Sequence, residues 1–212
     1  MTIVYRVGRG LYVNLTNRCP CACTFCIRQN GAGVYGSDSL WLEREPTADE
    51  VIAAIEEEDR SSFDELVFCG YGEPTERLDE LLAVARRVRA GFPQLPIRVN
   101  TNGLADLIAG GPTAGRFAGL VDALSVSLNA PTAEEYVRLC RPKFGAAAYE
   151  ALQKFAKEAK AYVPSVTMTV VGTPDMTPDR IAACREVCDR IGVPLRVRTY
   201  SAASTTATMA RS

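Results

Sequence analysis

The feature that most restricts the fold of this chain is a regular alternation of short apolar runs with segments of helical periodicity. Apolar runs of this length are typical of buried strands, whereas the longer segments between them repeat their apolar residues every three or four positions. Strands separated by helices imply a parallel sheet with right-handed crossovers. The six predicted strands are residues 11–16, 65–70, 96–101, 123–129, 165–172 and 194–200.

Three helix starts can be identified from capping residues. Thr47-x-x-Glu50 and Thr132-x-x-Glu135 have the spacing of a capping box, in which each side chain accepts a hydrogen bond from the other's backbone. Thr177 followed by Pro178 has the order expected of an N-cap and the first helical residue. These signals support helices in three of the segments that separate the strands.

Six strands and their helices fit either an open doubly wound sheet or a barrel with fewer than eight units. In both arrangements, functional residues lie just beyond the carboxyl ends of the strands. The 212 residues are enough for one large core, and we expect a single domain over residues 1–200. The small, polar residues 201–212 are expected to form a disordered tail.

Cysteine is the residue type that most limits the chemistry. The chain has eight cysteines and no histidine, which excludes Ser-His-Asp triads, histidine bases and imidazole zinc sites. No secretory signal or membrane span is visible, so we expect a cytoplasmic protein, in which clustered thiols favour metal binding over disulfides. The net charge of −1 gives no general electrostatic reason to expect binding to nucleic acid or membranes.

Four of the cysteines lie in the sequence CPCACTFCIR, directly after the first predicted strand. Cys19, Cys23 and Cys26 have the spacing C-x3-C-x2-C, and three thiolates can hold three irons of a [4Fe–4S] cluster while the fourth iron stays open. Two alternatives remain. Cys21 could complete a four-thiolate zinc site, or Cys21 or Cys69 could be the fourth ligand of a structural or electron-transfer cluster.

The C-x3-C-x2-C spacing resembles that of the radical SAM superfamily, in which the open iron chelates S-adenosylmethionine (SAM). The resemblance implies that Cys19, Cys23 and Cys26 are the metal ligands and that Cys21 is a spectator. CGYGEPT, residues 69–75, resembles the GGE motif of the same superfamily. The resemblance also implies a set of SAM-binding residues: Phe25, Gly70, Tyr71, Gly72, Glu73, Asn102, Ser127 and Asn129.

The proposed SAM contacts differ in type. Glycines at a strand end allow close backbone approach, and the Glu73 carboxylate can accept a hydrogen bond from the amine of SAM. Asn102, Ser127 and Asn129 supply amide and hydroxyl groups for the ribose, the carboxylate or the substrate. The alternative is that the glycines form an ordinary strand-to-helix turn and that Asn and Ser satisfy the loop backbone.

The chain as a whole resembles the TatD-associated radical SAM proteins, from YVNLTNRCPCACTFCIR through FCGYGEPT, VNTNGLADLI and SLNAP to LCRPKFG. That resemblance implies a partial (β/α)6 TIM-type barrel with parallel strands. It also implies an oxygen-sensitive enzyme in which a reduced [4Fe–4S] cluster cleaves SAM to methionine and a 5′-deoxyadenosyl radical, which abstracts hydrogen from a substrate. The implied partners are a flavodoxin- or ferredoxin-like reductant, a small-molecule or nucleotide-type substrate, and a TatD-type nuclease.

Other functions and other roles for the cysteines stay open. Compact radical SAM cores also serve as 7-carboxy-7-deazaguanine synthases and as glycyl-radical-activating enzymes. A different class of protein, a non-catalytic iron–sulfur or zinc module that binds or carries electrons, is the second alternative. Cys184 and Cys188 share the apolar face of a predicted helix and are expected in the core, and Cys69 and Cys140 are expected to be buried structural thiols.

Overall fold

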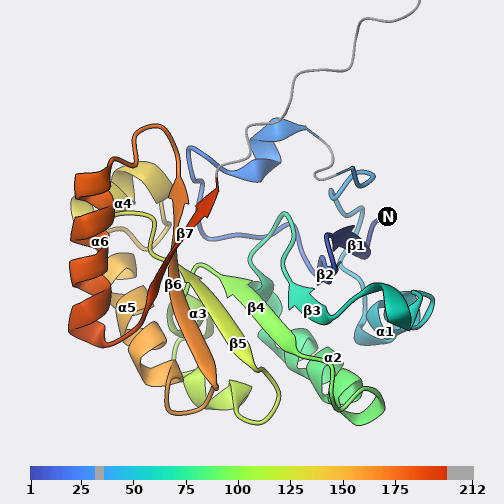
Figure 1. The fold of residues 1–212 in the computed structure, drawn as a ribbon. Helices are drawn as coiled ribbons and strands as arrows, with labels where there is room; N and C mark the ends of the chain where they lie inside the picture. The colour runs from blue at the N-terminus through green and yellow to red at the C-terminus, as the bar shows by residue number, and fades with distance from the viewer. Residues whose placement is uncertain (32–35, 200–212) are drawn as a thin grey trace, which may run out of the picture.

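Six parallel strands in sequential order form the centre of the molecule (Figure 1). The computed structural model describes residues 1–31 and 36–199. Each predicted strand is present, and the largest change is in the first one, which ends at Val13 instead of Thr16 because residues 14–16 already form the loop that follows. The parallel strands are β2 (Gly10–Val13), β3 (Glu65–Phe68), β4 (Ile97–Thr101), β5 (Ala123–Ser127), β6 (Ser165–Gly172) and β7 (Leu195–Thr199).

The strand order decides between the two predicted arrangements. A doubly wound sheet reverses direction at a switch point, whereas here every strand pairs with the next one along the chain. Right-handed crossovers in a sequential sheet place all helices on the same face, and the sheet curves away from them (Figure 1). The partial barrel predicted from the sequence is therefore confirmed.

The helices cover the convex face of the curved sheet, which leaves its concave face open to other uses. Within the described part of the chain, four short 3-10 helices lie in the connections. The helices are α1 (Ala48–Glu56), α2 (Leu78–Gly91), α3 (Ala105–Ala109), α4 (Ala133–Cys140), α5 (Ala147–Ala159), α6 (Pro178–Ile191), η1 (Ile27–Asn30), η2 (Arg60–Ser62), η3 (Pro74–Arg77) and η4 (Ala114–Phe117).

One strand was not predicted. β1 (Val4–Val7) pairs antiparallel with β2 through a tight hairpin in which Val7 is opposite Gly10. The hairpin turn begins with Gly8, whose φ of 57° is the left-handed conformation that such turns require. The sequence VGRG between two apolar runs was the signal for this hairpin. The predicted tail, residues 201–212, lies outside the described residues.

The three predicted helix starts are confirmed. At the first helix, Thr47 and Glu50 form the complete capping box, with the Glu50 amide donating to Thr47 Oγ1 at 3.2 Å. Thr132 Oγ1 accepts from the Glu135 amide at 3.3 Å, and Thr177 caps the last helix. These bonds satisfy backbone donors that a helix leaves unpaired at its start.

The hydrophobic core lies between the convex face of the sheet and the helices. Phe117 and Phe155 meet edge to face in this layer, with ring centroids 6.0 Å apart, and both are fully buried. Cys184 and Cys188 of α6 are also fully buried, which confirms that they pack in the core. No helix within residues 1–31 and 36–199 combines the length and the apolar character that crossing a bilayer would need.

Phe155→Ala is expected to lower the free energy of unfolding by about 3–5 kcal/mol, because it removes a fully buried ring and leaves a cavity. Urea denaturation followed by circular dichroism measures the change. Tyr162→Ala is the matched control, since that ring is 48% exposed, and it is expected to cost much less. Equal losses for the two variants would contradict this account of the core.

Candidate functional site

The cysteine loop, defined here as residues 17–26, leaves β2 and crosses the carboxyl ends of the parallel strands. On one side it is attached to the end of α4 by backbone hydrogen bonds and by a bridge between Cys21 and Pro142. Because the bonds use the backbone, they fix the path of the loop while the side chains stay free to point elsewhere. The bonds are Ala22 N to Cys140 O (3.0 Å), Thr24 N to Leu139 O (2.9 Å) and Lys143 N to Pro20 O (2.8 Å).

On its other side the loop lies against the segment that follows β3. The Glu73 amide donates to Arg18 O at 2.8 Å. A Cβ atom at Gly72 would lie 2.2 Å from Thr16 O and 2.6 Å from Arg18 O, which is too close for any side chain. Gly72 therefore permits the direct approach of two backbones at the start of the loop.

A pocket of about 210 Å³ lies between the cysteine loop and the carboxyl ends of the strands. Eight residues that the sequence predicted for the site line this pocket together, although four different segments of the chain supply them. Those eight residues are Cys19, Cys23, Phe25, Cys26, Glu73, Asn102, Ser127 and Asn129.

Three predicted residues do not line the pocket. Gly70 lies against the chain before the cysteine loop, where a Cβ would be 2.1 Å from Asn14 Oδ1. Gly72 lies against Thr16, before the loop, and Arg18, within it. The Tyr71 side chain points away, is buried beside Leu40 and donates from its hydroxyl to Gly31 O at 2.8 Å. These residues shape the wall behind the pocket.

The thiols of the loop contact one another and their surroundings. A hydrogen bond with Cys21, burial and the nearby Glu73 raise the pKa of the Cys19 thiol. The thiol of Cys23 has a raised pKa as well, first because of a hydrogen bond with Cys140 and then because of burial. These thiols are therefore protonated in the metal-free chain, and binding a metal would release their protons.

The thiols of the cysteine loop fit an iron–sulfur cluster better than a single metal ion. Within residues 1–31 and 36–199, no three Cys, Asp or Glu side chains lie close enough together to form a ready-made site for a single metal ion. Cys19, Cys23 and Cys26 nevertheless line the same pocket, and thiolates are the usual ligands of iron–sulfur clusters. A cluster is larger than a single ion, so the donor type and the placement of the three thiols fit it.

Glu73 is the buried carboxylate of the pocket, with 4% of its surface exposed. Its Oε1 atom accepts from the Thr75 amide, the Thr75 hydroxyl and the Thr101 hydroxyl at 3.1, 2.8 and 2.7 Å. Its Oε2 atom accepts from the Asn102 amide at 2.7 Å. Burial raises the pKa of Glu73, while these hydrogen bonds oppose the rise.

Glu73 Oε2 is therefore the oxygen with remaining capacity to accept a hydrogen bond. Among the described donors, only the Asn102 amide contacts Oε2, whereas three donors contact Oε1. The carboxylate lines the pocket, so a cationic group placed there would find an acceptor already held in position.

Asn129 has an unusual backbone conformation at the end of β5. Its φ is 59°, in the left-handed region, which asparagine tolerates better than most residues. Its side-chain amide lies 3.6 Å from the Cys140 sulfur, and its backbone amide donates to Thr169 O. This conformation turns the chain at the strand end while the residue lines the pocket.

Sequence reasoning missed several residues of the pocket. Cys21, expected to be a spectator, lines it, and the side-chain Nδ2 of Asn102 donates to its sulfur at 3.9 Å. Tyr136 of α4 carried no sequence signal, because its position on an apolar helix face is typical of the core. Asn100, Val171 and Arg198 could have been found from two-residue alternation, which places them on the concave face. The other pocket residues outside the predicted set of site residues are Ile27, Cys69, Asn100, Thr101, Cys140, Val171 and Arg198.

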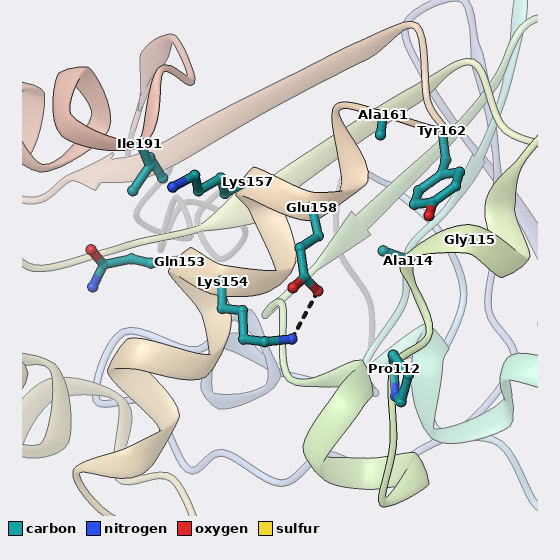
Figure 2. Close-up of a pocket in the computed structure, with 10 residues that line it drawn as sticks. All are labelled: Pro112, Ala114, Gly115, Gln153, Lys154, Lys157, Glu158, Ala161, Tyr162 and Ile191. Carbon is teal, nitrogen blue, oxygen red and sulfur yellow. Dashed lines mark hydrogen bonds and ion pairs between the residues drawn. The ribbon is translucent and has the colours of Figure 1, made fainter.

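A larger hollow of about 790 Å³ lies elsewhere, on the outer surface beside α5 (Figure 2). Its residues come from segments that precede β5, β6 and β7, so it is at the end of the barrel opposite the cysteine loop. Lys154 and Glu158 form an ion pair at 2.8 Å across part of it. It contains no cysteine, and size alone does not make it the reactive site.

A family model and curated relatives resemble this chain over most of its length. The model of the radical SAM superfamily matches residues 13–188. GTP 3′,8-cyclase of Mycobacterium sp. (strain KMS) is 28% identical over 198 residues, which cover 91% of this chain and 51% of that protein. GTP 3′,8-cyclase of Streptomyces coelicolor is 32% identical over 139 residues, which cover 64% of this chain and 37% of that one. The chain spans about half, or less, of the length of these relatives.

Solved structures share the fold at lower identity. Streptococcus suis SuiB bound to the precursor peptide SuiA has a TM-score of 0.67 and 15% identity, over 93% of this chain and 40% of that one. A radical SAM methyltransferase from Sphaerobacter thermophilus has a TM-score of 0.62 and 18% identity, over 96% of this chain and 70% of that one. At these identities the likeness concerns the fold.

Gly72→Ala is expected to lower the free energy of unfolding by about 1–3 kcal/mol, because the new methyl group would overlap two backbone carbonyls. Gly91→Ala is the matched control: a Cβ there meets nothing within 4 Å, so no loss is expected. Guanidinium denaturation of the two variants measures the difference. If Gly72→Ala were as stable as Gly91→Ala, the close approach described for the cysteine loop would be wrong.

Proposed function

This chain belongs to the radical SAM superfamily, and we propose that it is an enzyme that cleaves SAM reductively at the pocket under the cysteine loop. The observation that carries the proposal is that three thiols with the superfamily's spacing meet Glu73 and three polar strand-end residues in one pocket. When bound, a [4Fe–4S] cluster supplies an electron to SAM, which gives methionine and a 5′-deoxyadenosyl radical that abstracts hydrogen from a substrate.

Cys19, Cys23 and Cys26 are proposed to hold the cluster. Two backbone attachments fix the loop that carries them, one to the end of α4 and one to the segment after β3. A loop held in this way keeps the thiols in place when a metal replaces their protons. Cys21 is proposed to be a non-ligand, although its thiol lies beside those of Cys19 and Cys23 in the pocket.

SAM is proposed to bind beside the cluster ligands. Glu73 Oε2 is placed to accept a hydrogen bond from the amine of SAM, because the other carboxylate oxygen already has three donors. Asn102, Ser127 and Asn129 offer amide and hydroxyl groups for the ribose and the carboxylate. Phe25 contributes an apolar surface to the same pocket, and Gly70, Tyr71 and Gly72 support its wall.

Within the superfamily we place the chain among the TatD-associated radical SAM proteins. The motifs CGYGEPT, SLNAP and LCRPKFG support this assignment, and the third of them forms the attachment of the cysteine loop to α4. A nucleotide-type substrate agrees with that association and with the likeness to GTP 3′,8-cyclases. The proposed partners are a flavodoxin- or ferredoxin-like reductant and a TatD-type nuclease, in the reducing cytoplasm.

Two groups of alternatives remain distinguishable by experiment. A 7-carboxy-7-deazaguanine-synthase-like or glycyl-radical-activating enzyme would cleave SAM in the same way and would differ only in substrate. A non-catalytic iron–sulfur or zinc module would bind metal without cleaving SAM. The polar residues that surround the open side of the cysteine loop favour an enzyme, since a structural metal site needs no adjoining pocket.

Anaerobic reconstitution with iron and sulfide, followed by SAM and dithionite, is expected to produce 5′-deoxyadenosine, measured by liquid chromatography. Cys19→Ala, Cys23→Ala and Cys26→Ala should each abolish the product because each removes a cluster ligand. Cys21→Ala should retain it. If Cys21→Ala abolished the product and Cys26→Ala did not, the ligand assignment would be wrong. If fully loaded wild-type protein formed no product, the proposed function would be wrong.

Glu73→Gln is expected to weaken SAM binding to the reconstituted protein by roughly tenfold or more, because it removes a charged acceptor. For the wild type, affinity should fall as the pH drops through the pKa of Glu73, since the protonated carboxyl loses its charge. Because burial raises that pKa, the fall should begin at a higher pH than for an exposed glutamate, whose ordinary value is 4.5. Equilibrium dialysis at several pH values measures both effects.

The control is Glu56→Gln, which removes the same charge at an exposed position on the end of α1. It should leave both the affinity and its pH dependence unchanged. An unchanged pH dependence in Glu73→Gln would show that another group titrates.

A further inference from the structure

The concave face of the sheet carries polar and charged side chains in place of a packed apolar core. Strand residues alternate between the two faces, and the apolar ones face the helices. Barrel interiors are normally filled by branched apolar side chains, so a charged interior calls for an explanation. The arginines on this face are Arg98 of β4 and Arg196 and Arg198 of β7.

The contacts of the arginines show that they reach into the barrel. Arg196 of β7 donates to Ser125 Oγ of β5 at 3.1 Å. Because β6 lies between these two strands, the Arg196 side chain crosses over β6. Arg198 lines the pocket under the cysteine loop together with Ser127 and Glu73. Arg196 and Arg198 are both exposed, as charged residues of an edge strand usually are. The bond from Arg196 to Ser125 and the place of Arg198 in the pocket nevertheless direct both side chains across the concave face.

Within the described residues, one carboxylate forms an ion pair with these three guanidinium groups. Glu65 holds Arg98 in a bidentate pair, at 2.5 and 3.1 Å. Among residues 1–31 and 36–199, no carboxylate lies within ion-pair distance of Arg196 or Arg198. Partial burial and the positive charges of Arg98 and Arg198 lower the pKa of Arg196, while Glu65 opposes the fall. Arg196 and Arg198 are exposed on this face and have no ion-pair partner among the described residues, so their charges are available to an anion.

The arginines are connected to the proposed reactive site. Arg198 and Asn100 belong to the same pocket as Cys19 and Cys26, and Arg98 donates to Asn100 Oδ1 at 3.2 Å. Polar side chains therefore extend from Arg198 and Asn100 to Arg196 and Arg98, toward the floor of the barrel, which is the end where the parallel strands begin. A molecule that filled this path would have one end at the arginines and the other under the cysteine loop.

We propose that Arg196 and Arg198, supported by Arg98, bind the phosphate groups of the substrate inside the barrel. Guanidinium groups suit phosphate because they offer planar, paired donors and a permanent charge. The substrate class is therefore a phosphorylated small molecule, with its phosphates toward the barrel floor and its reacting carbon toward the cysteine loop. The orientation rests on the proposed function, whereas the binding of the anion does not.

Binding of inorganic pyrophosphate to the full, cluster-reconstituted chain tests the proposal, by anaerobic isothermal titration at fixed ionic strength. Pyrophosphate should bind, and Arg196→Gln and Arg198→Gln should each weaken the binding at least about tenfold. Arg198→Lys keeps the charge but not the paired donors, so its loss should be smaller. Thermal unfolding of each variant checks that it is folded.

Arg86→Gln is the charge-matched control, since Arg86 is exposed on α2 outside the barrel, and it should bind pyrophosphate as the wild type does. Malonate at the same ionic strength should bind more weakly, because its two carboxylates offer the guanidinium groups less negative charge and fewer acceptor oxygens than pyrophosphate does. Equal binding of pyrophosphate by all variants, no binding by the wild type, or equal binding of malonate would each overturn the proposal. Formation of 5′-deoxyadenosine by the wild type tests the proposed function separately.

Discussion

The backbone attachments of the cysteine loop are the constraint on which the rest of the site depends. One side of the loop is bonded to residues 139–143, and the other approaches Gly72 so closely that no side chain fits. Both attachments use main-chain atoms, so the thiols are left free for other contacts. The same approach places Glu73 at the pocket, because its amide is bonded to the loop while its carboxylate points into the cavity.

Much of the fold could be predicted from the sequence because its elements are marked by local signals. The six parallel strands are apolar runs, and the helix starts at Thr47, Thr132 and Thr177 carry side-chain caps. The barrel could not be separated from a doubly wound sheet, since strand order is a property of long-range pairing. β1 was missed because a strand of four residues at an edge has a weak pattern, although Gly8 marked its turn.

The candidate site was predictable in part for a similar reason. Residues at the ends of parallel strands meet at one edge of the sheet, so Glu73, Asn102 and Asn129 could be grouped from sequence position alone. Tyr136 could not, because it reaches the pocket from a helix face that reads as core. The position of Tyr71 also depended on packing, since its ring turns away to contact Trp41 at a centroid distance of 5.1 Å.

The sheet is open at both edges, with β1 at one edge and β7 at the other, and within the described residues no strand pairs with the free edge of β7. An unpaired strand edge is a template on which a further strand can pair through backbone hydrogen bonds. A strand added beside β7 would extend the sheet in its sequential order and would leave the helix layer on the convex face undisturbed.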